Sequence, residues 1–219
     1  MRSLLDLVFP ASCAGCGRTG AAVCVLCGEA LAGTPSLTWP SPCPPGMPAP
    51  YAVAAYEGSV RAMLLAYKDR DAVGLTATLA TALRRSLAHS LGAAAAQADD
   101  LPLVVAVPST RSATRRRGYD PLLRLARAAG CRPMRGVLAH VREIRDSAGL
   151  TAADRAVNLQ GALAVTPAFA ARLRGRTVVL LDDVVTTGAT LSESARALRA
   201  AGATVPSAAV IASTRRRKV

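Results

Sequence analysis

The stretch that decides the fold is Val178-Val-Leu-Leu-Asp182-Asp183-Val-Val-Thr186-Thr187-Gly188-Ala-Thr190-Leu191. Its four leading apolar residues predict a central strand, and two adjacent carboxylates follow at the end of that strand. A loop of hydroxyl side chains around a glycine comes next. The apolar spacing of Leu191, Ala195 and Leu198 then predicts a helix that begins at this loop and ends before Gly202. Strand, loop and helix in this order form the local unit of an α/β fold.

The chemistry of this stretch suits a sugar phosphate. Backbone N–H groups, threonine hydroxyls and a helix N-terminus together attract a phosphate group. Carboxylates would repel it, so Asp182 and Asp183 should face neutral hydroxyls or a metal ion. A ribose 5-phosphate meets both demands, with its 2′- and 3′-hydroxyls on the two aspartates. The remaining predicted ribose and phosphate contacts are Val184, Val185, Thr186, Thr187, Gly188, Ala189 and Thr190.

Three other interpretations of the stretch fit less well. A Walker B strand requires a GxxxxGK[ST] loop elsewhere in the chain, and a dinucleotide site requires GxGxxG after a strand; the sequence contains neither. A buried strand that merely ends in a solvated acidic turn leaves the Thr-Thr-Gly-x-Thr run unexplained.

The rest of the chain alternates between strand and helix patterns after residue 50. Central strands are expected at Leu103–Val107, which should be buried on both faces, and at Val178–Leu181. Further strand candidates are Tyr51–Tyr56, Gly136–Val141, Ala162–Val165 and Val205–Ser213, and helices are expected at Ser59–Lys68, Leu75–Leu91 and Pro121–Ala129. This alternation predicts a mostly parallel sheet flanked by helices, with its ligand site at the carboxyl ends of the strands.

The cysteines separate a small N-terminal module from this fold. Cys13, Cys16, Cys24 and Cys27 form two CxxC pairs seven residues apart. Four thiolates on two tight turns can surround a structural Zn²⁺ tetrahedrally and leave no open catalytic position. Disulfides would need an oxidising compartment, and a redox CxxC normally follows a strand at a helix start. Four free thiols are the remaining alternative.

The composition of the chain indicates three segments and the kinds of ligand that the protein favours. We expect a helix and zinc module over residues 1–33, a proline-rich connector over 34–50 and an α/β domain over 51–219. Cys43 in the connector is a spare ligand or a free thiol, and Cys131 is a small core residue. Apolar residues make up 51% of the chain, and a net charge of +13 favours phosphorylated ligands, nucleic acid or acidic lipid.

No stretch of the sequence suits a membrane-spanning helix, since the longest uncharged run, residues 30–56, contains seven prolines. Residues 1–10 fall short of a signal peptide because Asp6 interrupts the apolar run. We expect a short amphipathic helix there and a cytoplasmic protein without membrane insertion.

The stretch 178–191 closely resembles the phosphoribosyl pyrophosphate (PRPP) signature of type I phosphoribosyltransferases. Together with the cysteine pairs, other segments resemble the ComF/GntX family of competence-associated phosphoribosyltransferase-like proteins. They are Tyr56-Glu-Gly58…Lys68, Val107-Pro-Ser-Thr-Arg111…Arg116-Arg117-Gly118-Tyr119-Asp120-Pro121, and Arg142…Arg145…Gly149-Leu150…Arg155…Asn158. The resemblance implies a type I phosphoribosyltransferase-like domain that transfers phosphoribosyl from Mg²⁺-bound PRPP to an unknown acceptor and releases pyrophosphate.

The resemblance also implies roles for individual residues. Asp182 and Asp183 would be catalytic through the ribose, Pro108, Ser109, Thr110 and Arg111 would bind pyrophosphate, and Arg142, Arg145 and Arg155 would lie in a mobile loop that closes over PRPP. Arg145 and Arg155 could equally be ordinary surface residues. The family's Phe-Asn-Gln is replaced here by Tyr119-Asp120-Pro121, so an amide pair that could contact substrate is absent.

Two further roles stay open at this stage. The resemblance implies a part in the handling of single-stranded DNA during DNA uptake, with a helicase-type partner. The charge and Arg115–Arg117 permit binding to a phosphate backbone, but aromatic residues make up only 3% of the chain, which leaves Trp39 and Tyr119 as candidates for base stacking. A regulator that senses PRPP, or a nucleotide containing ribose 5-phosphate, without turnover is the other alternative.

Overall fold

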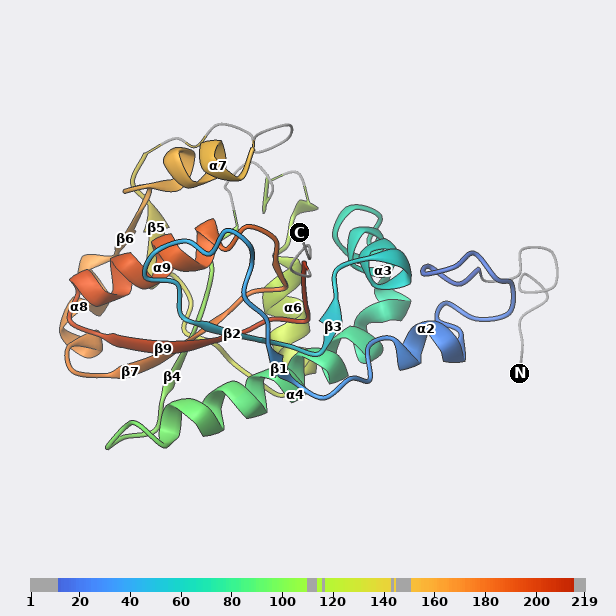
Figure 1. Ribbon diagram of the computed structural model, residues 1–219, viewed down its shortest axis with the longest axis horizontal. Helices are drawn as coiled ribbons and strands as arrows, with labels where there is room; N and C mark the ends of the chain where they lie inside the picture. The colour runs from blue at the N-terminus through green and yellow to red at the C-terminus, as the bar shows by residue number, and fades with distance from the viewer. Residues whose placement is uncertain (1–11, 110–113, 116, 143, 145–150, 215–219) are drawn as a thin grey trace.

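A computed structural model describes residues 12–109, 114–115, 117–142, 144 and 151–214 of the chain. Its centre is a five-stranded sheet of order β1-β2-β9-β7-β4 (Figure 1). The strands are β1 (Ser36–Leu37), β2 (Ala49–Ala52), β9 (Thr204–Ala209), β7 (Thr177–Leu181) and β4 (Leu103–Ala106). The pairs β2–β9, β9–β7 and β7–β4 are parallel, and only β1 runs antiparallel to its neighbour. The predicted α/β fold with a mostly parallel sheet is confirmed.

Helices cover both faces of this sheet, and β7 contributes to both layers. Val179 and Leu181 pack in one buried cluster with α3 (Gly58–Asp69), α4 (Thr76–Ala95) and α6 (Pro121–Ala128). Val178 and Leu180 point the other way, into a cluster with α8 (Pro167–Leu173) and α9 (Ala189–Ala200). Since successive side chains of a strand alternate between faces, only a strand of continuous apolar residues can fill both clusters.

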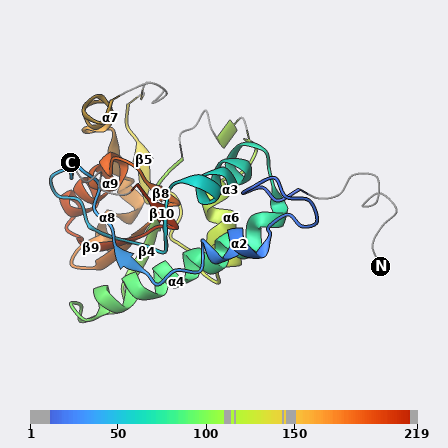
Figure 2. The same ribbon diagram turned by 45° about the vertical axis from the view of Figure 1, so that its right-hand side comes forward.

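The predicted strand Tyr51–Tyr56 is two strands in the structure. The backbone leaves the large sheet at Val53, whose N–H donates to Ile211 O at 3.2 Å. It then enters a small parallel sheet of order β3-β10-β8, made of β3 (Ala54–Ala55), β10 (Ala212–Ser213) and β8 (Val184–Val185). Figure 2 shows β8 and β10 between α9 and α3. The small sheet therefore ties the signature stretch to the segments that follow β2 and β9.

Two expectations about the remaining strands need correction. Leu103–Val107 is not a central strand buried on both faces, because β4 is the sheet edge and within it only Val105 is fully buried. On the outer side of β4 the sheet does not continue with another strand. Instead, the backbone N–H of Met134 donates a hydrogen bond to Val104 O. The other two strand candidates do not join the parallel sheet. They are β5 (Leu138–His140) and β6 (Leu163–Val165), which pair with each other in an antiparallel sheet that packs against α9.

Shorter elements complete the described part of the chain. They are α2 (Val25–Glu29), the 3₁₀ turn η1 (Val73–Leu75) and α7 (Ala152–Leu159). The helix expected within residues 1–10 lies outside the described residues. Among the described helices, none has both the length and the apolar character needed to cross a membrane.

Candidate functional site

The signature stretch forms a tight cradle at the carboxyl end of β7. Asp182 and Asp183 follow the strand directly, β8 comes next, and α9 begins after Gly188. Gly188 precedes the helix with φ +76°, a left-handed conformation that favours glycine. The turn encloses a hollow of about 20 Å³. All of its lining residues except Leu191 are predicted ribose or phosphate contacts: Asp182, Val184, Val185, Thr186, Thr187, Gly188, Thr190 and Leu191. The loop residues and the N-terminus of α9 thus surround one small space.

The two carboxylates differ in their surroundings. Asp182 accepts a hydrogen bond from the backbone N–H of Asp183 at 2.8 Å. Burial raises the pKa of Asp182 to about 8, and the neighbouring charge of Asp183 adds to the rise while Lys68 opposes it. The side chain of Asp183 is 12% exposed and pairs with a cation. The two adjacent carboxyl groups at the end of β7 are therefore unlike, because Asp182 has a raised pKa and Asp183 is held in an ion pair.

That cation is Lys68 of α3, whose Nζ lies 2.5 Å from Asp183 Oδ2. Burial alone would lower the pKa of Lys68, but the carboxylates of Asp183 and Asp182 raise it above its usual value. In the sequence, Lys68 belongs to a segment that resembles the ComF/GntX family, but nothing in that segment indicates a role for it. The composition does set Lys68 apart, because 25 of the 27 cationic residues are arginines and Lys68 is one of only two lysines.

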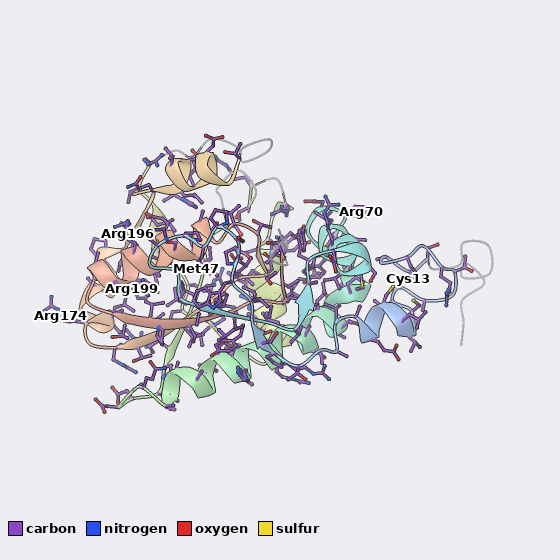
Figure 3. All side chains as sticks on the ribbon, viewed as in Figure 1. Cys13, Met47, Arg70, Arg174, Arg196 and Arg199 are labelled. Atoms are coloured by element: carbon purple, nitrogen blue, oxygen red, sulfur yellow. The ribbon has the colours of Figure 1, made fainter. Side chains whose placement is uncertain are left out.

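The proline-rich connector lies over the cradle rather than apart from it. A Cβ added to Gly188 would collide with the sulfur of Met47 and come within 3.1 Å of Pro40 Cγ. The connector is also tied to α9, where Ser192 Oγ donates to Pro45 O at 2.6 Å and Arg199 donates to Gly46 O. Figure 3 labels Met47 of the connector and Arg199 of α9. Residues 40–47 of the connector thus form a strap over the cradle. Close packing against this strap and the positive φ together require glycine at position 188.

Part of the predicted pyrophosphate loop lies next to the carboxylates. Val107 N–H donates to Leu181 O at 2.9 Å, so the chain after β4 continues beside the end of β7. Pro108 and Ser109 follow there and are half-buried. Thr110 and Arg111 lie outside the described residues. The binding role of this segment stays a prediction.

The predicted mobile loop is described only at its ends. Arg142 donates to Asn158 O and Gln160 O at 2.8 Å each, and so satisfies carbonyl groups at the end of α7. Arg145 lies outside the described residues. Arg155 belongs to α7, and its side chain also lies outside the description. A closing role for this segment stays a prediction.

The two departures from the family pattern have structural roles. Asp120 caps α6, because its carboxylate accepts from the N–H groups of Leu122 and Leu123. Tyr119 donates its hydroxyl to Asp71 at 2.6 Å, and Arg124 also pairs with Asp71, at 2.7 Å. These contacts fasten the start of α6 to the end of α3, the helix that carries Lys68.

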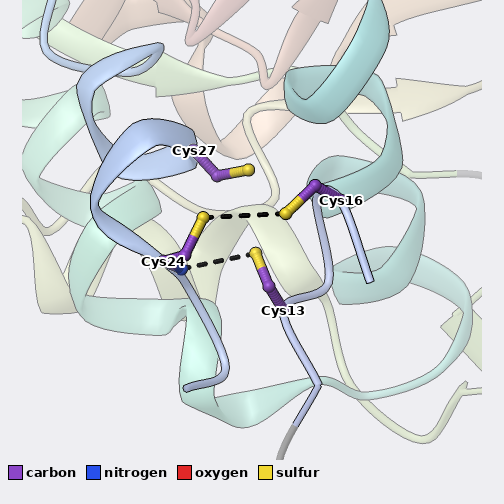
Figure 4. A group of neighbouring side chains, drawn as sticks. All are labelled: Cys13, Cys16, Cys24 and Cys27. Atoms are coloured by element: carbon purple, nitrogen blue, oxygen red, sulfur yellow. Dashed lines mark hydrogen bonds between the residues drawn. The ribbon is translucent and has the colours of Figure 1, made fainter. Parts of the chain in front are cut away.

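The four N-terminal cysteines converge, as their spacing predicts. Their sulfur atoms all lie within 4.8 Å of one another, and the sulfurs of Cys16 and Cys24 are 3.6 Å apart (Figure 4). A tetrahedron of Zn–S bonds of ~2.3 Å places its sulfurs about 3.8 Å apart, so this donor set fits zinc. All six cysteines of the chain are free thiols, which contradicts the disulfide alternative. Cys43 is exposed and is not part of the cluster.

The cysteine cluster is packed against the α/β core. Cys13 and Cys27 are buried in the same cluster of side chains as α3 and α4. A Cβ added to Gly15 would lie 2.8 Å from the sulfur of Cys27 and 3.0 Å from Cβ of Ser59, the second residue of α3. Glycine is therefore required where the first cysteine turn meets α3. Cys131 is partly buried beside the same core, as expected.

Comparison with known proteins agrees with the geometry of the cradle. Residues 116–219 match the family model of the phosphoribosyl transferase domain. Two curated relatives, the adenine phosphoribosyltransferases of Mycobacterium avium (strain 104) and Mycolicibacterium paratuberculosis (strain ATCC BAA-968 / K-10), are each 56% identical over 45 residues, which is 20% of this chain. The chain spans only about a quarter of the length of these relatives.

The matched segment is similar to the phosphoribosyl transferase domain and covers a little less than half of the chain. It includes β7, both carboxylates, the cradle and α9. Lys68, the connector and the cysteine cluster lie outside it, although they contact the same site or the same core. The site is therefore assembled from matched and unmatched parts of the chain.

Proposed function

We propose that the protein binds PRPP with Mg²⁺ and transfers its phosphoribosyl group to an acceptor, with release of pyrophosphate. The observation that carries this proposal is the order of the functional groups that follow β7. Two adjacent carboxylates stand directly before an amide-lined cradle at the N-terminus of α9. A ribose 5-phosphate carries hydroxyls and a phosphate at matching positions, and the matched domain is that of phosphoribosyl transferases.

Each group of the site has a task in this reaction. The backbone N–H groups and threonine hydroxyls of residues 186–190 would hold the 5′-phosphate, with the positive end of α9 behind them. Asp182 and Asp183 would hold the ribose hydroxyls, and Pro108, Ser109, Thr110 and Arg111 would line the pyrophosphate side. Mg²⁺ on the pyrophosphate oxygens would neutralise the leaving group. Positioning and electrostatics then supply the rate enhancement without a covalent intermediate.

We also propose that Cys13, Cys16, Cys24 and Cys27 bind one structural Zn²⁺. The distances between their sulfur atoms support a closed tetrahedral site, which leaves no position for catalysis. Free thiols that converge on a metal also fit the cytoplasm, the reducing compartment that the sequence suggested.

The wider likeness to the ComF family is part of the proposal, but contacts within the protein weaken its DNA-handling alternative. Tyr119, one of two candidates for base stacking, is bonded to Asp71. Arg117 pairs with Asp69 at 3.4 Å, while Arg115 is exposed. Two of the groups expected to contact DNA are thus engaged internally. A PRPP sensor would use the same cradle and differ only in turnover.

A pyrophosphate-release assay tests the proposal against these alternatives. The protein is incubated with PRPP and Mg²⁺ and supplied in turn with nucleobases, amines and single-stranded DNA. Release that depends on one acceptor class and is lost in Asp183→Asn supports transfer. PRPP binding without release for every acceptor would instead support a sensor.

A further inference from the structure

The last turn of α3 ends in a left-handed backbone conformation shortly after Lys68. The N–H of Arg70 still donates to Ala66 O at 3.0 Å, and the chain then leaves the helix at Asp71, whose φ is +46°. Among the described residues, Asp71 is the only one other than glycine with a positive φ. Glycine is the usual residue at a left-handed helix end because it has no Cβ. An aspartate at this position therefore indicates a role for its side chain.

The carboxylate of Asp71 receives two hydrogen bonds from the start of α6. The hydroxyl of Tyr119 and Nη1 of Arg124 donate to the same oxygen, Oδ1, at 2.6 and 2.7 Å. The guanidinium carbon of Arg124 also lies 4.9 Å from the centroid of the Tyr119 ring. The hydrogen bonds from Tyr119 and Arg124 lower the pKa of Asp71, so they favour its charged form. We call Asp71, Tyr119 and Arg124 the α3 clamp.

The α3 clamp contacts the chain on both sides of Lys68. Asp71 lies after Lys68, and Tyr67 lies directly before it. Tyr67 is buried, and its ring centroid is 5.8 Å from the guanidinium carbon of Arg124. The side chain of Lys68 is 31% exposed and reaches from this turn to the carboxylate of Asp183. Since a lysine side chain has many rotamers, the position of its ammonium group depends on the position of the turn that carries it.

We propose that Asp71, Tyr119 and Arg124 are positioning residues, which fix the last turn of α3 so that Lys68 stays beside Asp183. The inference rests on the proposed function, in which Asp183 holds the ribose, and deepens it by assigning a role to side chains away from the cradle. A cation fixed at this point would reduce the repulsion between the carboxylates and the phosphates of PRPP. The α3 clamp would thus raise the affinity of the site for PRPP through Lys68.

The α3 clamp should contribute little to the stability of the whole protein. The side chain of Asp71 is 59% exposed and that of Arg124 is 31% exposed, and ion pairs in contact with water add little to the free energy of unfolding. The apolar face of α3, which includes the buried Met63 and Leu64, should hold the helix on the core without the clamp. Variants of the clamp can therefore displace Lys68 while the protein remains folded.

Lysine NMR tests the position of Lys68 directly, because Lys68 and Lys218 are the only lysines of the chain. Protein labelled with ¹³C at lysine Cε gives a signal for each, and Lys68→Met identifies the Lys68 signal. Asp183→Asn should shift that signal, since the ammonium group loses its counterion. Asp71→Gly suits the positive φ but removes the carboxylate of the clamp. It should therefore shift the Lys68 signal in the same direction and leave the melting temperature nearly unchanged.

A matched pair of arginine variants on α6 provides the control. Arg124→Gln removes a member of the clamp and should act like Asp71→Gly. Arg127→Gln, at an exposed position of the same helix, should leave the Lys68 signal and the PRPP affinity unchanged. A Lys68 signal that is the same in wild type, Asp71→Gly and Arg124→Gln would overturn the proposal.

Calorimetry with PRPP and Mg²⁺ distinguishes a failure of the clamp from a failure of the proposed function. Asp71→Gly should weaken PRPP binding by about threefold to tenfold. It should have no further effect in Lys68→Met, because the clamp acts through Lys68. An equal loss of affinity with and without Lys68 would overturn the proposal. Wild-type protein that binds no PRPP would overturn the proposed function, while a Lys68 signal that shifts in Asp71→Gly would still support the clamp.

Discussion

Lys68 Nζ and Asp183 Oδ2 are 2.5 Å apart, which joins the last turn of α3 to the end of β7 across 115 residues of sequence. Lys68 supplies a positive charge beside the two neighbouring carboxyl groups of Asp182 and Asp183. Without Lys68, the negative charge of Asp183 would have no counterion next to Asp182. The side chain of Asp183 is only 12% exposed, so water would screen this charge poorly. The ion pair therefore holds the Asp183 carboxylate, which we propose as a ribose ligand, in place.

Removal of this cation should destabilise the protein. We expect Lys68→Met to lower the free energy of unfolding by about 1–3 kcal/mol, because it leaves a mostly buried carboxylate without its charged partner. Urea denaturation measures the change. The double variant Lys68→Met/Asp183→Asn should recover most of the loss, whereas Arg84→Met on the exposed face of α4 should change little. A double variant no more stable than Lys68→Met would show that the ion pair is not the cause.

Stability should also depend on pH through Asp182. Its pKa is raised from the usual 3.8 to about 8 in the folded protein, so the folded state binds this proton more tightly than the unfolded state. The corresponding stabilisation is complete below pH ~4 and is lost as the pH rises through about 8. Asp182→Asn removes the titration, so it should unfold at a higher temperature than wild type at pH 8–9 and show a flatter pH profile. Melting curves at several pH values test this, and an equal slope in both proteins would contradict it.

The cysteine cluster makes a separate prediction. Purified protein should contain about one zinc per chain, and Cys13→Ser should lose the metal and much of its stability, because metal affinity of a structural site is folding energy. Cys43→Ser is the matched control, since Cys43 is exposed and outside the cluster. Elemental analysis together with melting curves gives the answer. Stably folded wild-type protein without metal would contradict the zinc assignment.

The local features of this fold were predictable from the sequence. The run Val178–Leu181, the carboxylates and the glycine-containing loop lie within 14 residues, so the order of strand, cradle and helix follows from composition and spacing. The convergence of the four cysteines was predictable for the same reason. By contrast, Leu103–Val107 has the composition of a central strand but lies at the sheet edge, because the order of strands depends on contacts between distant segments.

The remaining parts of the site depend on such distant contacts. The pairing of Lys68 with Asp183 and the packing of Met47 against Gly188 each join segments more than a hundred residues apart. The connector looked like an extended linker, yet it contributes β1, the strap over the cradle and one wall of a hollow of about 420 Å³ that residues 52–55 and 213–214 also line. None of these contacts leaves a pattern in one stretch of sequence.

The strap over the cradle should make position 188 intolerant of any side chain. Gly188→Ala combines a positive φ with a collision against Met47, and should lower the free energy of unfolding by about 1–3 kcal/mol. Met47→Ala in the same chain should restore part of this loss, because it relieves the collision but not the strain in φ. Urea denaturation of the two single variants and the double variant measures the coupling. Strictly additive effects would mean that the connector does not press on the cradle.

Binding of PRPP, measured by titration calorimetry, tests the central claim most directly. We expect saturable binding that requires Mg²⁺, because the pyrophosphate would otherwise meet the carboxylates of the site without a counterion. Asp183→Asn should weaken binding by about 1.5–3 kcal/mol through the loss of a charged hydrogen bond, and Asp99→Asn, in an exposed loop, should bind like wild type. Folded wild-type protein that binds neither PRPP nor ribose 5-phosphate at millimolar ligand would contradict the assignment of the cradle.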